Sequence, residues 1–117
     1  MVEFIKFKLS GSSNGKAIKI AATSTPGTLI HTAVTETTSL DEIWTYVTNN
    51  HTASLALTIE WGGVAVPDDI IQQSIPAKTG LYLLIPGLVL NNGMVLRAFA
   101  QTANLLTISG WVNRIVG

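Results

Sequence analysis

The chain has 117 residues, of which 47% are hydrophobic and 12% are charged, and its formal net charge is zero. This length supports one domain with a core of its own, and the absence of cysteine excludes a disulfide framework and thiolate chemistry. Ordinary domains carry about 25% charged residues. So low a charge content indicates that another protein covers part of the surface.

The first eight residues carry Glu3, Lys6 and Lys8, which interrupt any apolar signal-peptide segment. No apolar run reaches the length of a membrane span. We therefore expect synthesis in a cytoplasm and no membrane partner. Lysines gather in the first twenty residues, but they do not form a basic stripe with stacking aromatics, so we expect no specific nucleic-acid partner.

Residues 2–9, VEFIKFKL, have strong β propensity and precede a turn-forming segment at 10–15. They either form a hairpin with the alternating run at 16–21 or act as an arm that pairs with a neighbouring subunit. We therefore divide the chain into residues 1–14, an N-terminal arm or edge strand, and residues 15–117, a single β-sandwich domain.

The segment at 39–48 is ambiguous. Ser39–Glu42 fits a helix capping box, but residues 43–48 are all β-branched or aromatic, which favours a strand. Residues 55–61 alternate apolar and polar side chains, as a half-buried strand does. We expect the strands at 43–48 and 55–61 to form a hairpin, with Trp61 in the core.

Further strands and turns are expected in the second half of the chain. The apolar run at 80–85 is typical of a strand buried on both faces, and Pro86–Gly87 should turn the chain after it. Asn91–Gly93 predicts another turn, before a strand in which Met94 faces the core. Gly110 marks a bulge or a close backbone approach in the last strand. Other strands are expected at 28–34, 70–75, 94–100 and 105–116.

Many short strands separated by turn residues, without a convincing helix, predict an all-β fold of the β-sandwich or jelly-roll type with about eight strands. Alternation in the last strand places Leu105, Trp111 and Ile115 on its outer face. An exposed row of this kind is unusual for a monomer and indicates either a partner or a second packed sheet.

The sequence gives no sign of catalysis. His31 and His51 are the only histidines and lie on different segments, and no G-x-S-x-G motif is present. We expect no enzymatic activity, no catalytic residue and no cofactor. The pairs Asp41–Glu42 and Asp68–Asp69 offer oxygen ligands of the kind that calcium prefers, but the EF-hand spacing is absent. We interpret them as solvated loop and rim charge and predict no metal site.

Carbohydrate binding is an alternative function. Trp44, Tyr46 or Trp61 would serve as a sugar platform beside the acidic residues. Burial of these aromatics in the core is the competing interpretation.

Several spaced blocks together resemble small virion structural proteins of tailed bacteriophages, over residues 15–116. The blocks are Gly15–Thr25 with Pro26–Gly27, Ile30–Ala33, Ser39–Trp44, Thr58–Gly63 with Pro67–Asp69, Pro86–Gly87, Asn92–Gly93, Arg97–Ala100, and Gly110 with Val112–Ile115. Residues 1–14 lie outside the resemblance, which suits a variable arm.

This resemblance implies a β-sandwich that is added to the capsid as a decoration, or cement, protein and clamps neighbouring major capsid subunits. A neck or tail component is the alternative. The implied partners are the major capsid protein or other virion proteins, and the implied location is the capsid surface of the virion. We expect a homo-oligomer, a trimer or dimer at a symmetry axis. We predict Phe4, Phe7, Trp111 and Ile115 as its contact residues.

Overall fold

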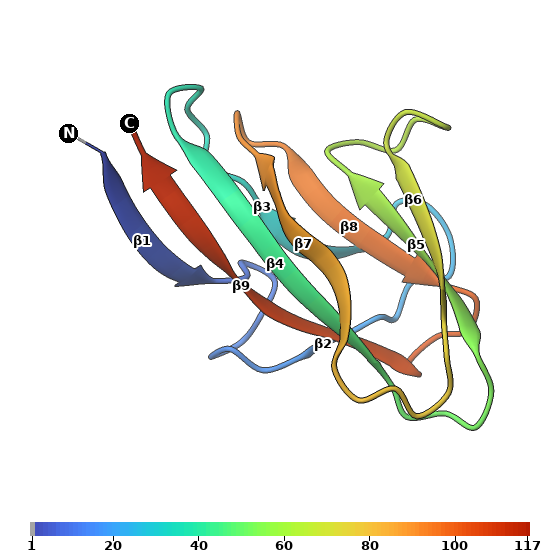
Figure 1. Cartoon of the computed structure of the whole chain (residues 1–117). Helices are drawn as coiled ribbons and strands as arrows, with labels where there is room; N and C mark the ends of the chain where they lie inside the picture. The colour runs from blue at the N-terminus through green and yellow to red at the C-terminus, as the bar shows by residue number, and fades with distance from the viewer. Residues whose placement is uncertain (1) are drawn as a thin grey trace.

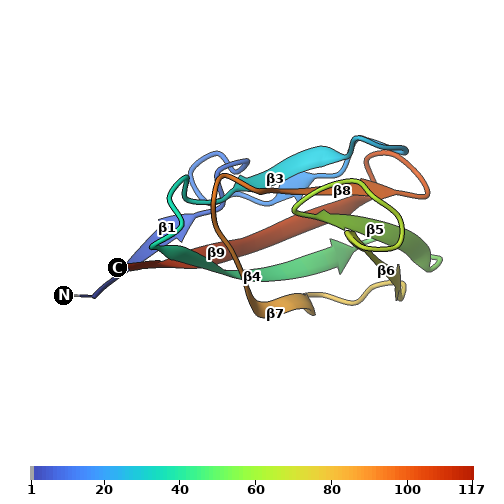
Figure 2. The same cartoon turned by 90° about the horizontal axis from the view of Figure 1, so that it is seen from above.

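The computed structural model describes residues 2–117. Its β-strands form two antiparallel sheets that pack face to face as a β-sandwich (Figures 1 and 2). The strands are β1 (Glu3–Lys8), β2 (Ile18–Lys19), β3 (Thr28–Thr32), β4 (Leu40–Asn49), β5 (Leu55–Trp61), β6 (Ile70–Ile75), β7 (Tyr82–Leu90), β8 (Val95–Ala100) and β9 (Leu106–Val116). Within residues 2–117 no helix has the length and apolar character of a membrane span.

Sheet A has the strand order β1-β9-β4-β7, with β2 also paired to β9, and sheet B has the order β3-β8-β5-β6. Apart from β1 to β2 and β5 to β6, each connection crosses from one sheet to the other. This is the arrangement of a jelly roll. The predicted fold class is therefore confirmed.

The core lies between the sheets and consists almost entirely of aliphatic side chains. Strand β4 shows the alternation most clearly, because Ile43 and Val47 are fully buried while Trp44 and Tyr46 face outward and are only partly buried. The competing helix at 39–48 is thus excluded. Trp61 was predicted to lie in the core; it is only partly buried and packs against the core from its edge, so this prediction is confirmed in part.

The predicted hairpin between residues 43–48 and 55–61 is wrong. Strand β4 lies in sheet A and β5 lies in sheet B, so the two face each other across the core and do not pair. The alternative hairpin at the N-terminus is also absent, because β1 and β2 both pair with β9. Lys8 lies opposite Trp111 and Ile18 lies opposite Ile108, so β1 and β2 follow one another along the same edge of sheet A.

The prediction for residues 80–85 and the turn after them is wrong as well. Strand β7 continues through Pro86–Gly87 and lies at an edge of sheet A, where Leu83 is 47% exposed. An edge strand has one side without a hydrogen-bonded neighbour and so tolerates a proline, which has no N–H. Met94 is exposed because it precedes β8, and the residues of β8 that do face the core are Leu96, Ala98 and Ala100.

Gly110 does mark a close backbone approach. A Cβ atom at this position would lie 2.0 Å from the carbonyl oxygen of Trp44, and the φ angle of Gly110 is 155°. Glycine is required where two strands approach so closely. It allows β9 to pass against β4 and brings Trp111 directly opposite Trp44.

Candidate functional site

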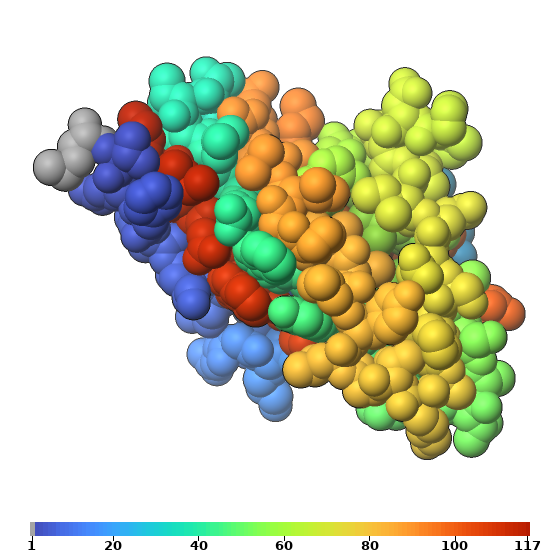
Figure 3. All heavy atoms as spheres, in the orientation of Figure 1, coloured from blue at the N-terminus to red at the C-terminus, as the bar shows by residue number. Residues whose placement is uncertain are grey.

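The outer face of sheet A is formed by β1, β9, β4 and β7 lying side by side (Figure 3). No other part of residues 2–117 crosses over the middle of this face in the space-filling view. Residues that are directly opposite on neighbouring strands point to the same side, so the face can be followed as rows of side chains.

The central row is aromatic. Trp44 and Trp111 stack with ring centroids 5.9 Å apart and planes 10° apart, and Tyr46 stacks on Trp111 with a centroid distance of 6.0 Å. The ammonium of Lys6 lies 5.4 Å from the ring centroid of Trp111. Each aromatic pair contributes about 0.5–1.5 kcal/mol beyond its area burial. We call Trp44, Tyr46 and Trp111 the aromatic cluster.

Trp44 is held from two sides. Its indole N–H donates to Glu42 Oε1 at 2.7 Å, and Asn113 Nδ2 donates to the same oxygen at 3.1 Å. These hydrogen bonds, first from Trp44 and then from Asn113, lower the pKa of Glu42 below its ordinary value. Beneath the ring lies Gly87, whose φ angle is 83° and where a Cβ atom would come within 2.8 Å of Trp44 Cζ2. Trp44 is therefore fixed in place.

Exposed apolar side chains surround the cluster. Phe4 and Leu40 lie on either side of Ile115, and they are 75% and 37% exposed. Strand β7 adds Leu83 opposite Tyr46 and Val89 opposite Glu42, each 47% exposed. We call Phe4, Leu40, Leu83, Val89 and Ile115 the outer apolar face.

Three of the four predicted contact residues lie together on this side of sheet A, namely Phe4, Trp111 and Ile115. Phe7 does not join them, because it lies three residues after Phe4 and points to the inner side of the strand. There its ring lies 4.4 Å from the guanidinium carbon of Arg114. Their role as contact residues stays a prediction.

A buried polar network lies between the sheets close to β1. Ser10 N–H donates to His31 Nδ1 at 3.0 Å, so the ring proton is on Nε2, which donates to Asp41 Oδ2 at 2.7 Å. Arg114 completes the network with a bidentate pair, Nε to Oδ1 at 2.7 Å and Nη2 to Oδ2 at 3.0 Å. The network joins β3, β4 and β9. Because His31 and Asp41 are only 2% and 0% exposed, it offers no access to a substrate.

The interpretation of Asp41 as loop or rim charge is wrong, since it lies within β4 and is completely buried. Burial is the largest single influence on its carboxyl and acts to raise the pKa. The hydrogen bonds and positive charge of Arg114, with the hydrogen bond of His31, outweigh burial and lower the pKa of Asp41 below its ordinary value.

A pocket of about 330 Å³ lies on the opposite side of the molecule, on the outer face of sheet B. Its floor is made by β5, β6 and β8, and its rim by the segments at 23–27 and 62–69. The lining residues are Thr25, Thr58, Glu60, Val64, Val66, Pro67, Ile70, Gln72 and Phe99. We call it the sheet B pocket.

Glu60 is the charged residue of this pocket and is only 1% exposed. Gly27 N–H donates to Glu60 Oε1 at 2.6 Å, and the Thr25 hydroxyl donates to Glu60 Oε2. Sequence reasoning did not single out Glu60. Alternation placed it on the outer side of β5, but nothing local showed that the segment at 23–27 folds over it.

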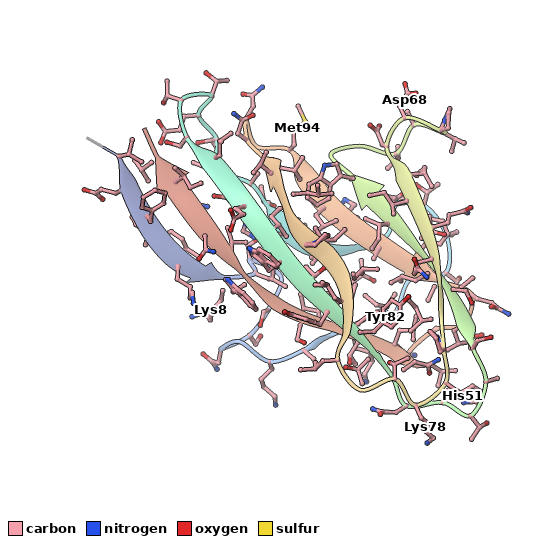
Figure 4. All side chains as sticks on the ribbon, in the orientation of Figure 1. Lys8, His51, Asp68, Lys78, Tyr82 and Met94 are labelled. Carbon is pink, nitrogen blue, oxygen red and sulfur yellow. The ribbon has the colours of Figure 1, made fainter. Side chains whose placement is uncertain are left out.

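The remaining acidic and histidine residues do not come together in one site. Asp68 lies at one end of the strands, and His51 and Lys78 lie at the opposite end (Figure 4). Asp69 accepts a hydrogen bond from Ala65 N–H and shapes its own loop. Across the part of the chain that the structure describes, no group of three or more His, Asp or Glu side chains is placed to hold a metal ion.

The chain was compared with models of protein families, with curated proteins and with solved structures, and none of the three comparisons gave a match.

Proposed function

We propose that this chain is a structural protein of a tailed-phage virion, a capsid decoration protein that clamps neighbouring major capsid subunits. The observation that carries the proposal is the outer apolar face of sheet A, with the aromatic cluster at its centre. Phe4, Leu83 and Val89 are each at least 47% exposed, and strand β7, which carries the latter two, places Ile85 in the core. Exposed apolar patches of this kind mark surfaces that bind other proteins.

The proposed clamp acts by burying apolar surface between this protein and the capsid subunits. Each square ångström of apolar area removed from water stabilises a contact by about 25 cal/mol, before the costs of association. A module that contacts two neighbouring subunits adds this free energy to the cost of separating them. The fixed positions of Trp44 and Trp111 reduce the ordering cost on binding, because the two rings already stack and Trp44 is hydrogen-bonded to Glu42.

Strand β1 supplies a second contact. It is exposed along its whole length and pairs on one side only, with β9. Its free edge can pair with an extended segment of a neighbouring subunit. A dimer or trimer of this chain, with the major capsid protein or another virion protein as partner, uses both surfaces. A neck or tail component would use the same surfaces at another place in the particle.

The test is binding to particles. The chain would be expressed with the gene products encoded beside its own gene, and assembled particles would be sedimented and analysed for it. The double variant Phe4→Ser/Leu83→Ser should lose at least tenfold in bound copies. Leu29→Ser, which changes a 37% exposed leucine on β3 in sheet B, is the matched control and should bind as the unmodified chain does. Sedimentation with tails alone would favour the neck or tail role.

Carbohydrate binding is the second candidate, because three aromatics lie beside Glu42 and Asn113 on one exposed face. The stacking of the rings on one another and of Lys6 on Trp111 leaves less free ring face for a sugar. A glycan array decides between the candidates. Glycan binding that disappears with Trp44→Ala, together with no binding to particles, would replace the assembly role with a lectin role.

A further inference from the structure

The sheet B pocket contains a buried carboxylate without a cationic partner. Within residues 2–117, the ion pair with an N–O distance of 4.0 Å or less is that of Asp41 with Arg114, and His31 adds a hydrogen bond to the same carboxylate. Both hydrogen-bond donors to Glu60 are neutral groups, a backbone N–H and a hydroxyl. A buried charge is usually paired with an opposite charge, because neutral donors compensate its desolvation only in part.

The cationic residue opposite Glu60 on the neighbouring strand binds a backbone carbonyl oxygen. Arg97 lies directly opposite Glu60 on β8, but its Nη1 donates to the carbonyl oxygen of Gly27 at 3.2 Å. This contact supports the segment at 23–27, and Arg97 forms no ion pair with Glu60 within 4.0 Å. The floor of the pocket therefore holds a carboxylate whose hydrogen-bond donors are neutral groups.

The walls of the pocket are largely apolar. Ile70 and Phe99 rise from the sheet, and Val64 and Val66 stand on the β5–β6 loop, where they are 51% and 81% exposed. A long cationic side chain matches such walls, because its aliphatic stem packs on apolar groups while its charged end forms an ion pair. An arginine matches best, since its planar guanidinium can also stack on the Phe99 ring and donate to several acceptors at once.

We propose that the sheet B pocket binds an arginine side chain presented by a partner polypeptide, with the guanidinium paired to Glu60. A polypeptide fits better than a free small cation, because the exposed Val64 and Val66 extend the apolar surface beyond the pocket, where residues flanking the arginine would pack. This site lies on the sheet opposite to the outer apolar face. It is therefore independent of the surface that carries the proposed function.

The test uses two short capped peptides, Leu-Arg-Leu and the same peptide with citrulline, which keeps the shape of arginine without its charge. Binding to the full chain would be followed by NMR titration of the Gly27 amide. The arginine peptide should bind, and the citrulline peptide should bind about ten- to a hundredfold more weakly. Glu60→Gln should reduce the affinity for the arginine peptide by the same factor and remove the preference for arginine. Equal binding of the two peptides would overturn the proposal, as would no shift at millimolar arginine peptide.

A second variant keeps the test valid if Glu60→Gln does not fold. Val66→Lys places a cation on the exposed rim and should weaken the arginine peptide about tenfold. Val89→Lys is the matched control on the outer apolar face and should leave peptide binding unchanged. Free arginine that binds as tightly as the peptide would overturn the role of a polypeptide partner. Loss of particle binding in Phe4→Ser/Leu83→Ser with intact peptide binding would separate this site from the proposed function.

Discussion

Among residues 2–117, the carboxylates of Asp41 and Glu60 are buried, and their surroundings differ. Asp41 lies between the sheets, where Arg114 and His31 pair with it and Val34 N–H adds a further hydrogen bond. Glu60 lies on the outside of sheet B beneath a loop, where neutral groups hydrogen-bond it and a pocket opens above it. Asp41 is paired within the fold, whereas Glu60 has neutral donors and, among residues 2–117, no ion-pair partner within 4.0 Å.

The different surroundings of the two carboxylates indicate a structural role for Asp41 and a binding role for Glu60. Removing one partner of a buried ion pair leaves the other charge without compensation and strongly destabilises a protein. Removing a charge that only neutral groups solvate costs far less. Asp41 should therefore govern stability, and Glu60 should govern recognition.

Asp41→Asn is expected to have the largest effect on stability. It removes the charge that compensates Arg114 and should lower the free energy of unfolding by about 3 to 5 kcal/mol. Urea or guanidinium unfolding measures this change. Glu42→Gln, which alters the neighbouring carboxylate on the outer side of β4, where it is only partly buried, is the control and should change the stability much less. Similar losses for the two variants would remove the special role of Asp41.

Acid should weaken the same network. The folded pKa of Asp41 is lowered, so the ionised carboxylate stabilises the fold fully above the ordinary range near about pH 4, and this contribution is lost as the pH falls through the lowered pKa. Unfolding curves recorded from neutral to acidic pH should show the gap in stability between the unmodified chain and Asp41→Asn becoming smaller. A gap that stays constant would contradict the pairing.

Glu60→Gln should have a smaller effect on stability than Asp41→Asn. The glutamine keeps the shape and one acceptor for the N–H of Gly27, so the expected loss is about 1 kcal/mol. Unfolding curves recorded alongside those of Asp41→Asn give the comparison. A loss as large as that of Asp41→Asn would make Glu60 a structural group.

Leu83→Ser should have the smallest effect. Leu83 is 47% exposed on an edge strand, so its replacement should change the free energy of unfolding by about 0.5 kcal/mol or less. Ile85→Ser, two residues further along β7 and 1% exposed, is the matched comparison and should destabilise by several times more. Equal stability changes would mean that the outer apolar face belongs to the packed structure of the free protein.

The elements of the fold follow from local sequence patterns, but their pairing does not. Alternation identified β5 and β9, and the β-branched run at 43–48 identified β4, because burial on one face repeats every second residue. The short loop at 50–54 suits a hairpin and a crossing between sheets equally well. Only the packing of both apolar sides around one core selects the crossing.

The candidate sites depended on contacts that are distant in sequence. Trp111 and Ile115 could be placed on an outer face from alternation alone. The burial of Asp41 depends on Arg114, 73 residues away, and that of Glu60 depends on Thr25, 35 residues away. No local pattern distinguishes a carboxylate that will be covered by such a distant segment from one that stays in water.

Covalent footprinting gives the most direct test that the outer apolar face serves assembly. The chain would be labelled free and within assembled particles, and modification would be read residue by residue. An assembly role predicts strong protection of Phe4, Leu83 and Val89 in particles and unchanged labelling of Leu29 on sheet B. Equal labelling of the three outer residues in the two states would contradict it.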